Sequence, residues 1–197
     1  KDNLKARLAF STVGQLSYII LGIAILSPFA ATGALYHIVA HAFMKITLFM
    51  CAGAIFVTTH RKNISEMIGI GRQMPVTMTC FTLASLAVAG FPFFVGFTSK
   101  ANIIMGAISM GQPFFVATLI VSALLALTYL MPVVLLAFKR DFYNSQFPVK
   151  KEAVLPMLIP IMFTAACSLM LGVMPNFGLH LYDLAAMAGN AIFGLSL

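Results

Sequence analysis

Long apolar segments, separated by short polar or charged stretches, make up most of this chain. A helix needs about 20 mainly apolar residues to cross the hydrocarbon core of a bilayer. The pattern therefore predicts membrane-spanning helices. The expected helical segments are residues 4–26, 32–59, 75–90, 94–109, 114–138, 154–173 and 176–197. The last of these could either span the membrane or lie at its surface.

Glycine and proline mark where these helices end. Ser27-Pro28 ends the first segment and Phe91-Pro92 ends the third. Gly111-Gln112-Pro113 interrupts the fourth span, because glycine is conformationally permissive and proline lacks a backbone donor. We predict an all-α polytopic membrane protein with a single transmembrane domain over residues 1–197. It should have about six transmembrane segments, one of them discontinuous near 110–113.

Three protonatable residues recur at steps of four in the second segment: His37, His41 and Lys45. This spacing places them on one helix face over roughly 12 Å. A lysine costs about 2.5–3.5 kcal/mol at the bilayer centre, so such residues usually serve a function. Histidine titrates near neutral pH. The row, joined by water, is predicted to relay protons, and Lys100 is a second intramembrane cation.

Simpler readings exist for these residues. Lys45 could extend to the cytoplasmic face, and Lys100 could form a structural ion pair. Ser11, Gln15 and Tyr18 form a polar stripe on the first segment. The stripe either lines a hydrated path or supports packing between helices.

Composition and charge support a membrane protein. Of all residues, 61% are hydrophobic and only 9% are charged, whereas a soluble domain has about 25% charged residues. All lysines and arginines except Lys45 and Lys100 lie in residues 1–7, 60–72 and 139–152. The turns expected on the opposite side, near 27–32, 91–93 and 174–176, contain none. The positive-inside rule therefore predicts that loops 60–72 and 139–152 are cytoplasmic.

The net charge of +7 does not indicate a nucleic-acid partner, because no basic stripe is interleaved with aromatic residues. All five acidic residues lie outside the main spans or at the last helix. An anionic partner for Lys45 or Lys100 is therefore expected from outside this sequence. Cys51, Cys80 and Cys167 are isolated in apolar runs, without metal-ligand spacing. We predict no catalytic residue, metal site or cofactor, and any redox chemistry would belong to partner subunits.

Several sequence blocks resemble a family of antiporter-like membrane subunits. This family is shared by Mrp-type cation/proton antiporters, respiratory complex I and membrane-bound hydrogenases. The matching blocks are Asp2-Asn3-Leu4-Lys5, Leu8-Ala9-Phe10-Ser11-Thr12, His37-x3-His41-Ala42-Phe43-Met44-Lys45, Gly69-Ile70-Gly71-Arg72-Gln73-Met74-Pro75, Gly90-Phe91-Pro92 and Gly96-Phe97-Thr98-Ser99-Lys100. They follow the family order over about the first 100 residues, and the later segments agree in their pattern of spans.

The resemblance implies a fold of about fourteen helices with two inverted repeats, each containing a broken helix. Only the C-terminal half is matched, and the chain starts at Lys1, so it is expected to be part of something longer. Lys5 matches the lysine that links two half-channels. His37, His41 and Lys45 match the central relay, and Lys100 matches the lysine of the second broken helix. Phe10 and Phe93 replace a more usual Tyr and Pro, and neither change removes a titratable relay group.

The block around Lys5 and the block 69–75 most resemble the D-type subunits of Mrp antiporters. We therefore predict a proton-translocating subunit of a multisubunit Na⁺/H⁺ antiporter in a bacterial or archaeal inner membrane. Its partners would be other subunits of the complex, the lipid bilayer, protons and Na⁺. One alternative is a proton-pumping subunit of a complex I-type oxidoreductase or a membrane-bound hydrogenase. Another is a truncated subunit that serves only as a structural scaffold.

Overall fold

The computed structural model describes residues 1–139 and 151–194, and these residues are almost entirely helical. In chain order the elements are α1 (Leu4–Ala24), α2 (Pro28–Thr59), η1 (Ile64–Glu66), α3 (Ile70–Gln73), α4 (Pro75–Ala89), α5 (Val95–Ser109), α6 (Pro113–Phe138), α7 (Leu155–Val173) and α8 (Leu181–Ile192). Helices α1, α2, α6 and α7 are long and apolar enough to cross a membrane. The predicted all-α polytopic class is confirmed.

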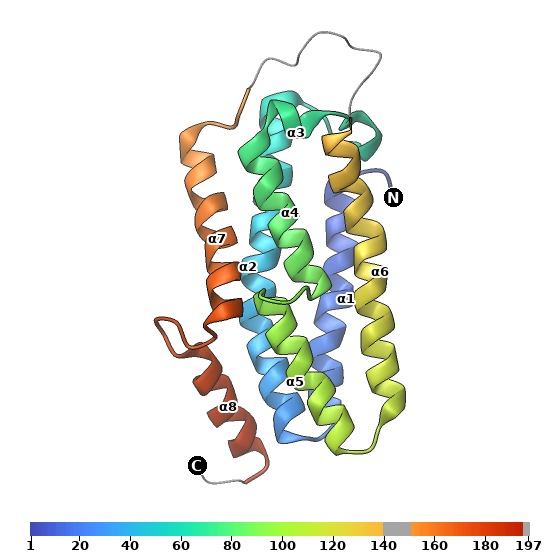
Figure 1. Ribbon diagram of the computed structural model, residues 1–197, viewed down its shortest axis with the longest axis vertical. Helices are drawn as coiled ribbons and strands as arrows, with labels where there is room; N and C mark the ends of the chain where they lie inside the picture. Colours follow the sequence, from blue (N-terminus) through green and yellow to red (C-terminus); the bar gives the residue numbers. More distant parts are fainter. Residues whose placement is uncertain (140–150, 195–197) are drawn as a thin grey trace.

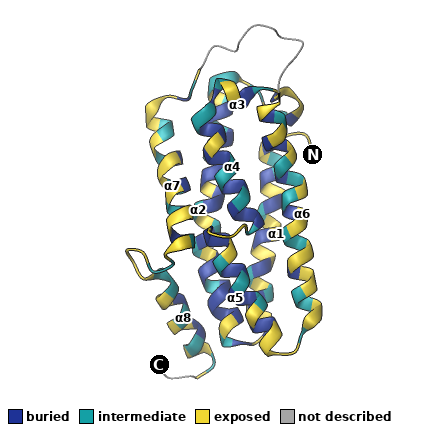
Figure 2. Ribbon diagram, in the orientation of Figure 1, coloured by how far each residue is buried: buried dark blue, intermediate teal, exposed yellow. Residues whose placement is uncertain are grey.

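The 32-residue α2 is the central helix of the bundle. It packs against α1, α4, α5, α7 and α8. Buried residues concentrate on α2, α4 and α5, whereas the outer faces of α1, α6, α7 and α8 are exposed (Figure 2). Large apolar side chains such as Ile20, Phe114 and Leu135 lie on these outer faces. A surface of this kind is expected of helices that face lipid.

The discontinuous span is not where the sequence placed it. Helices α4 and α5 follow one another in the same direction, and the break between them lies midway along the bundle (Figure 1). The break at 110–112 exists, but there the chain reverses at the end of the bundle between α5 and α6. Each break has a glycine followed two residues later by a proline, Gly90 with Pro92 and Gly111 with Pro113, and each adjoins a 15-residue helix. Sequence pattern alone therefore could not show which break reverses the chain.

Helices α7 and α8 repeat this arrangement on the other side of α2 (Figure 1). Tyr182 of α8 packs edge-on against Tyr36, with ring centroids 5.4 Å apart. Further along α8, a Cβ on Gly189 would lie 2.6 Å from the Thr32 hydroxyl oxygen. The last helix therefore lies along the first turns of α2. The turn expected near 174–176 is consequently beside the bundle and not at its end.

The basic residues gather at one end of the bundle, as predicted. The N-terminus is joined to the segment before η1 by backbone hydrogen bonds from Leu4 to Lys62 and from Ile64 to Asp2. Lys139 and Lys151 lie at the same end, since the Lys151 N–H donates to the Gln73 backbone oxygen and the Lys139 backbone oxygen lies beside Gly69. Residues 140–150 of the predicted loop 139–152 lie outside the described residues. The opposite end, formed by residues 25–27 and 110–112, has no basic side chain.

Candidate functional site

The inward face of α2 carries the predicted row. His37 is fully buried, Lys45 is 4% exposed, and His41 is half-buried. The two imidazole rings lie 6.4 Å apart, centroid to centroid. The four-residue spacing thus stacks the three groups on one side of the helix, as the sequence predicted.

Lys45 is held by oxygen atoms of α1. Its Nζ donates to the Ser11 Oγ at 2.6 Å and to the backbone oxygen of Leu8 at 3.2 Å. The Ser11 hydroxyl in turn lies 2.6 Å from the Tyr129 hydroxyl of α6. Lys45 therefore does not reach the surface, and its hydrogen-bond acceptors are uncharged.

Lys100 is held at the break between α4 and α5. Its Nζ donates to the backbone oxygen of Val88 at 2.6 Å. In a continuous helix that oxygen would accept from residue 92, but Pro92 has no N–H. Gly90 adopts φ +87, which turns the chain out of α4. The same residues that break the helix therefore free the carbonyl group that binds the lysine.

Tyr18 and Ser99 lie between the histidines and Lys100. The His37 Nδ1 is 2.7 Å from the Ser99 Oγ. The Tyr18 ring lies 5.6 Å from the His37 ring and 4.7 Å from the Lys100 Nζ. Lys45 and Lys100 are thus joined by a row of polar side chains within the bundle.

Four buried polar atoms along this row have no hydrogen-bond partner among the described residues: the Gln15 Oε1, the Tyr18 hydroxyl, the His37 Nε2 and the His41 Nε2. Buried polar groups are normally paired with protein or with water. Ser11, Gln15 and Tyr18 are all buried on α1 and face the row. The predicted polar stripe is therefore part of the site, and the site is polar enough to hold water.

Lys5 is not brought to the row. Its side chain is exposed at the basic end of the bundle, and its Nζ lies 5.2 Å from the Phe56 ring centroid. Its predicted role in linking half-channels remains a prediction. The four described carboxylates also lie elsewhere, since Asp2, Glu66 and Glu152 are at the basic end.

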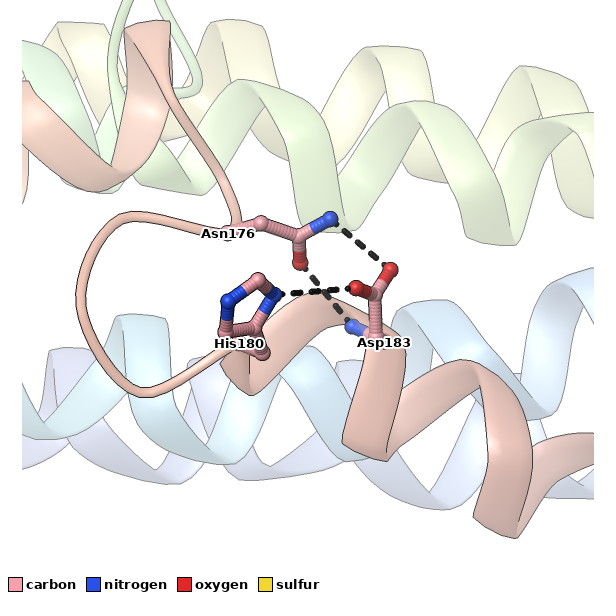
Figure 3. Close-up of polar contacts among 3 residues, drawn as sticks. All are labelled: Asn176, His180 and Asp183. Atoms are coloured by element: carbon pink, nitrogen blue, oxygen red, sulfur yellow. Dashed lines mark hydrogen bonds and ion pairs between the residues drawn. The ribbon is translucent and has the colours of Figure 1, made fainter.

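The fourth described carboxylate, Asp183, closes the turn between α7 and α8 (Figure 3). It accepts from the Asn176 side chain at 2.8 Å and lies 3.3 Å from the His180 Nδ1. The Asp183 backbone N–H donates back to Asn176. This cluster holds His180, at φ +49, at the start of α8. It contacts neither lysine, and its role is to shape the turn.

Sequence reasoning missed the partners of the row. Ser99 lies inside the matched block before Lys100, but its bond to His37 depends on α2 and α5 meeting. Tyr129 lies in an apolar segment. The one feature of the sequence that could have pointed to it is that polar residues are rare in that segment. The sequence could have shown that the Val88 oxygen lacks a helical donor, because the residue four positions later is Pro92. No sequence signal indicated that Lys100 would be the side chain that occupies it.

The groups of the row have proton-exchange chemistry. Lysine amines, imidazoles and hydroxyls can each accept and donate protons. The row is enclosed between α1, α2 and α5, away from the outer surface.

Comparison with known proteins gives the family. Residues 1–126 match the family model described as "NADH:quinone oxidoreductase/Mrp antiporter, TM". The chain belongs to this family. The match contains the whole row on α2 and the break that holds Lys100, and it confirms the resemblance found in the sequence. It also supports the predicted location in a bacterial or archaeal membrane.

Relatives within the family are subunits of different complexes. NADH-quinone oxidoreductase subunit N from Desulforudis audaxviator is 35% identical over 84% of this chain and 35% of its own length. F(420)H(2) dehydrogenase subunit L from Methanosarcina mazei is 32% identical over 90% of this chain and 28% of its own. The chain thus spans about a third of the length of these relatives.

Solved structures of the family share the fold. A chain of the Mrp complex from Dietzia sp. DQ12-45-1b superposes with a TM-score of 0.83 and 22% identity, over 95% of this chain and 43% of its own. A chain of respiratory complex I from Thermus thermophilus also gives a TM-score of 0.83, with 21% identity, over 98% of this chain and 40% of its own. Both structures are multisubunit membrane assemblies.

Proposed function

We propose that this chain forms the proton-relay part of an ion-translocating membrane subunit. The observation that carries the proposal is the enclosed row from Lys45 through His41 and His37 to Lys100. Each lysine is buried, and each is held by uncharged oxygen atoms. Breaking a buried ion pair leaves a carboxylate unpaired, which is costly. A lysine held by uncharged oxygen atoms can lose and regain its proton without that cost.

We expect protons to move along the row in short steps between neighbouring side chains. A proton leaving Lys45 reaches His41 and then His37 through intervening water. His37 is oriented by Ser99, which leaves its Nε2 available to the row. Tyr18 presents its ring face to Lys100, and a cation is attracted to that face. The charged form of Lys100 is thereby favoured close to the break.

The assembly that uses this relay has two candidates. The sequence blocks around Lys5 and 69–75 favour a Na⁺/H⁺ antiporter of the Mrp type, in which Na⁺ moves elsewhere in the complex. The second candidate is a redox-driven proton pump. It is favoured by the relatives named above, which are subunits of NADH-quinone and F(420)H(2) oxidoreductases. In either complex this chain would contact other membrane subunits.

The test uses inside-out membrane vesicles that contain the full complex. Addition of Na⁺ should dissipate an imposed pH gradient in the wild type and fail to do so in Lys100→Ala. Lys139→Ala serves as a matched control, because it removes an exposed lysine at the basic end. Native gels show whether each variant assembles.

The outcomes separate the candidates. A proton pump would give no response to Na⁺ but would acidify the vesicles on addition of a reductant, again only with Lys100 present. If an assembled Lys100→Ala complex transports normally under both conditions, the relay proposal is wrong. The scaffold alternative then remains, and it predicts lower stability without loss of ion flux.

A further inference from the structure

A groove of about 500 Å³ lies between α1 and α6. Lys1 and Arg7 line it at the basic end of the bundle, and Gln15 and Ser122 line it further down. The groove is open to the surface. Its lining combines hydroxyl, amide and charged groups with the apolar surface of side chains such as Phe10 and Leu125. The polar groups give water hydrogen-bond partners along the groove.

The groove passes beside the hydroxyl pair that holds Lys45. Ser11 and Tyr129 both line the groove. Tyr129 is held by its backbone oxygen, which accepts from the Arg7 Nη1 at 3.1 Å. The hydroxyl groups of Ser11 and Tyr129 are 2.6 Å apart, and the Ser11 Oγ is 2.6 Å from the Lys45 Nζ. A continuous chain of short contacts thus runs from the groove to the buried lysine.

We infer that Tyr129 and Ser11 form a proton-transfer pair through which Lys45 exchanges protons with the groove. The inference rests on the proposed relay and adds its connection to the basic end of the bundle. Nothing in the sequence pattern assigned a role to Tyr129, and the groove exists only because α1 and α6 diverge.

In the transfer step each hydroxyl gains one proton and loses one, so neither residue changes its net protonation. A hydronium ion in the groove gives a proton to the Tyr129 oxygen, which passes its own proton to the Ser11 oxygen. Ser11 then passes its proton to the neutral Lys45 amine, and the O–H bonds re-form on both residues. The reverse sequence discharges Lys45 into the groove. Each hydroxyl can serve because it is both a donor and an acceptor.

The charged residues that line the groove are both cationic. They are Lys1, which precedes α1, and Arg7 of α1 at the mouth of the groove, and on α2 the facing groups are Lys45 and the His41 imidazole. Arg7 donates its Nε and Nη2 hydrogens to the backbone oxygen of Lys1. No described carboxylate lines the groove. The groove therefore offers Na⁺ no carboxylate ligand, whereas a proton can pass from one hydroxyl to the next.

The first experiment measures transport by the full complex in vesicles. Tyr129→Phe keeps the ring and removes the hydroxyl. It should slow proton transport by roughly 100-fold, the lower end of what a positioned proton-transfer group contributes. Ser11→Ala should act similarly, and Ser11→Thr, which keeps a hydroxyl, should restore most of the rate. Tyr36→Phe is the control, because it removes a buried tyrosine hydroxyl that bonds Leu171, away from the row.

The outcomes distinguish this inference from the proposed function. If Lys100→Ala abolishes transport while Tyr129→Phe matches the wild type, the relay stands and the transfer pair is wrong. If Tyr129→Phe and Tyr36→Phe slow transport equally, Tyr129 is only structural. Loss in Tyr129→Phe and Ser11→Ala, with rescue by Ser11→Thr, supports the pair. If Tyr129→Phe makes proton transfer rate-limiting, replacing H₂O by D₂O should reduce the transport rate of the variant by a larger factor than that of the wild type.

A second experiment tests whether water fills the groove. In a background with Cys51, Cys80 and Cys167 replaced by alanine, Ser122→Cys should react with a membrane-impermeant thiol reagent added at the basic end. Val121→Cys is the control, because Val121 is exposed on the outer face of α6 but does not line the groove. Absence of reaction at Ser122→Cys, or equal reaction at both positions, overturns the groove as a route for protons.

Discussion

Lys45 and Lys100 are held by different kinds of neutral acceptor. Lys45 uses a serine hydroxyl and a backbone oxygen of an intact helix, whereas Lys100 uses a backbone oxygen freed by Pro92. An ammonium group has three donors. Two are used by Lys45 and one by Lys100 within the described residues. The remaining donors, one on Lys45 and two on Lys100, have no hydrogen-bond acceptor among the described residues.

Helices α2 and α5 pack closely where Gly33 of α2 lies against the backbone around Ser99. A Cβ added there would lie 2.7 Å from the Ser99 backbone oxygen and 2.8 Å from the Ile103 backbone nitrogen. Gly33→Ala should therefore destabilise the protein by about 1–3 kcal/mol, the usual cost of overpacking. The thermal midpoint of the purified subunit in detergent measures the change.

Gly53→Ala provides the matched control on the same helix. No atom lies within 4 Å of a Cβ added at Gly53. This substitution should be neutral or should stabilise by up to about 1 kcal/mol, because alanine favours helix over glycine. Equal midpoints for the two variants would show that the α2–α5 contact is looser than described.

At the scale of elements, the break between α4 and α5 determines the position of Lys100. The Gly90 N–H bonds back to Leu86 and Ala87, so α4 ends there with its last carbonyls partly satisfied. Gly96 faces the Ala87 oxygen so closely that any side chain would collide. Two half-helices can therefore meet end to end, with a side chain inserted between them.

Pro92→Ala should weaken this arrangement. The new N–H at residue 92 can donate to the Val88 oxygen and compete with Lys100. A hydrogen bond to a charged group contributes about 1.5–3 kcal/mol, so transport should fall by roughly tenfold or more while the complex still assembles. Vesicle transport and a native gel measure the two effects.

Pro75→Ala is the control for Pro92→Ala. Pro75 stands at the first position of α4, where no helical N–H bond is needed. Its replacement should leave transport unchanged. If Pro92→Ala also transports at the wild-type rate, the freed carbonyl does not determine how Lys100 works.

The contact between the N-terminus and η1 should depend on pH. Hydrogen bonds from the Ser65 hydroxyl and backbone N–H lower the pKa of the Asp2 carboxyl below 3.8. Bonds from the Asn63 backbone and side chain likewise lower the pKa of the Glu66 carboxyl below 4.5. Because the pKa values are lower in the folded protein, both ionised carboxylates stabilise the fold at pH values above 3.8 and 4.5. This stabilisation is lost as the pH falls through the lowered values.

Asp2→Asn and Glu66→Gln measure this contribution. Each variant should have a lower thermal midpoint than the wild type at pH 6, and the difference should shrink towards pH 3. Both groups are exposed, so the effect is expected to be small. A difference that persists unchanged at pH 3 would show that charge is not its cause.

At the scale of the whole molecule, polarity is sorted along the bundle. Basic side chains occupy one end, apolar side chains cover the outer faces, and the polar row lies inside. Figure 2 shows the matching separation of buried inner faces from exposed outer faces. The chain crosses the bundle along α1, α2, α4 with α5, α6, and α7 with α8 (Figure 1). The two ends therefore face opposite sides of the membrane.

Single cysteines test this topology in the cysteine-free background. Lys62→Cys should react with an impermeant thiol reagent only from the cytoplasmic side, because it lies at the basic end. Gln112→Cys, in the turn between α5 and α6, should react only from the opposite side. Reaction of both from the same side would contradict the assignment of the 110–112 turn to the far end.

The sequence by itself determined the helices and the face of α2 that carries His37, His41 and Lys45. Apolar length placed most helix bounds within a few residues, because a bilayer imposes a minimum span. Helical periodicity placed His37, His41 and Lys45 on one face, because steps of four nearly complete a turn. The distribution of lysine and arginine identified the basic end. These properties depend only on local geometry and composition.

Only the tertiary structure decided which break lies within a span, and what the buried lysines contact. The stretches 90–94 and 110–112 look alike locally, and packing against α2 makes the first a junction and the second a reversal. The acceptors of Lys45 come from α1, the hydroxyl that bonds Ser11 comes from α6, and the oxygen that holds Lys100 comes from α4. Such contacts join residues far apart in the chain, so they depend on how whole helices pack, which no local pattern records.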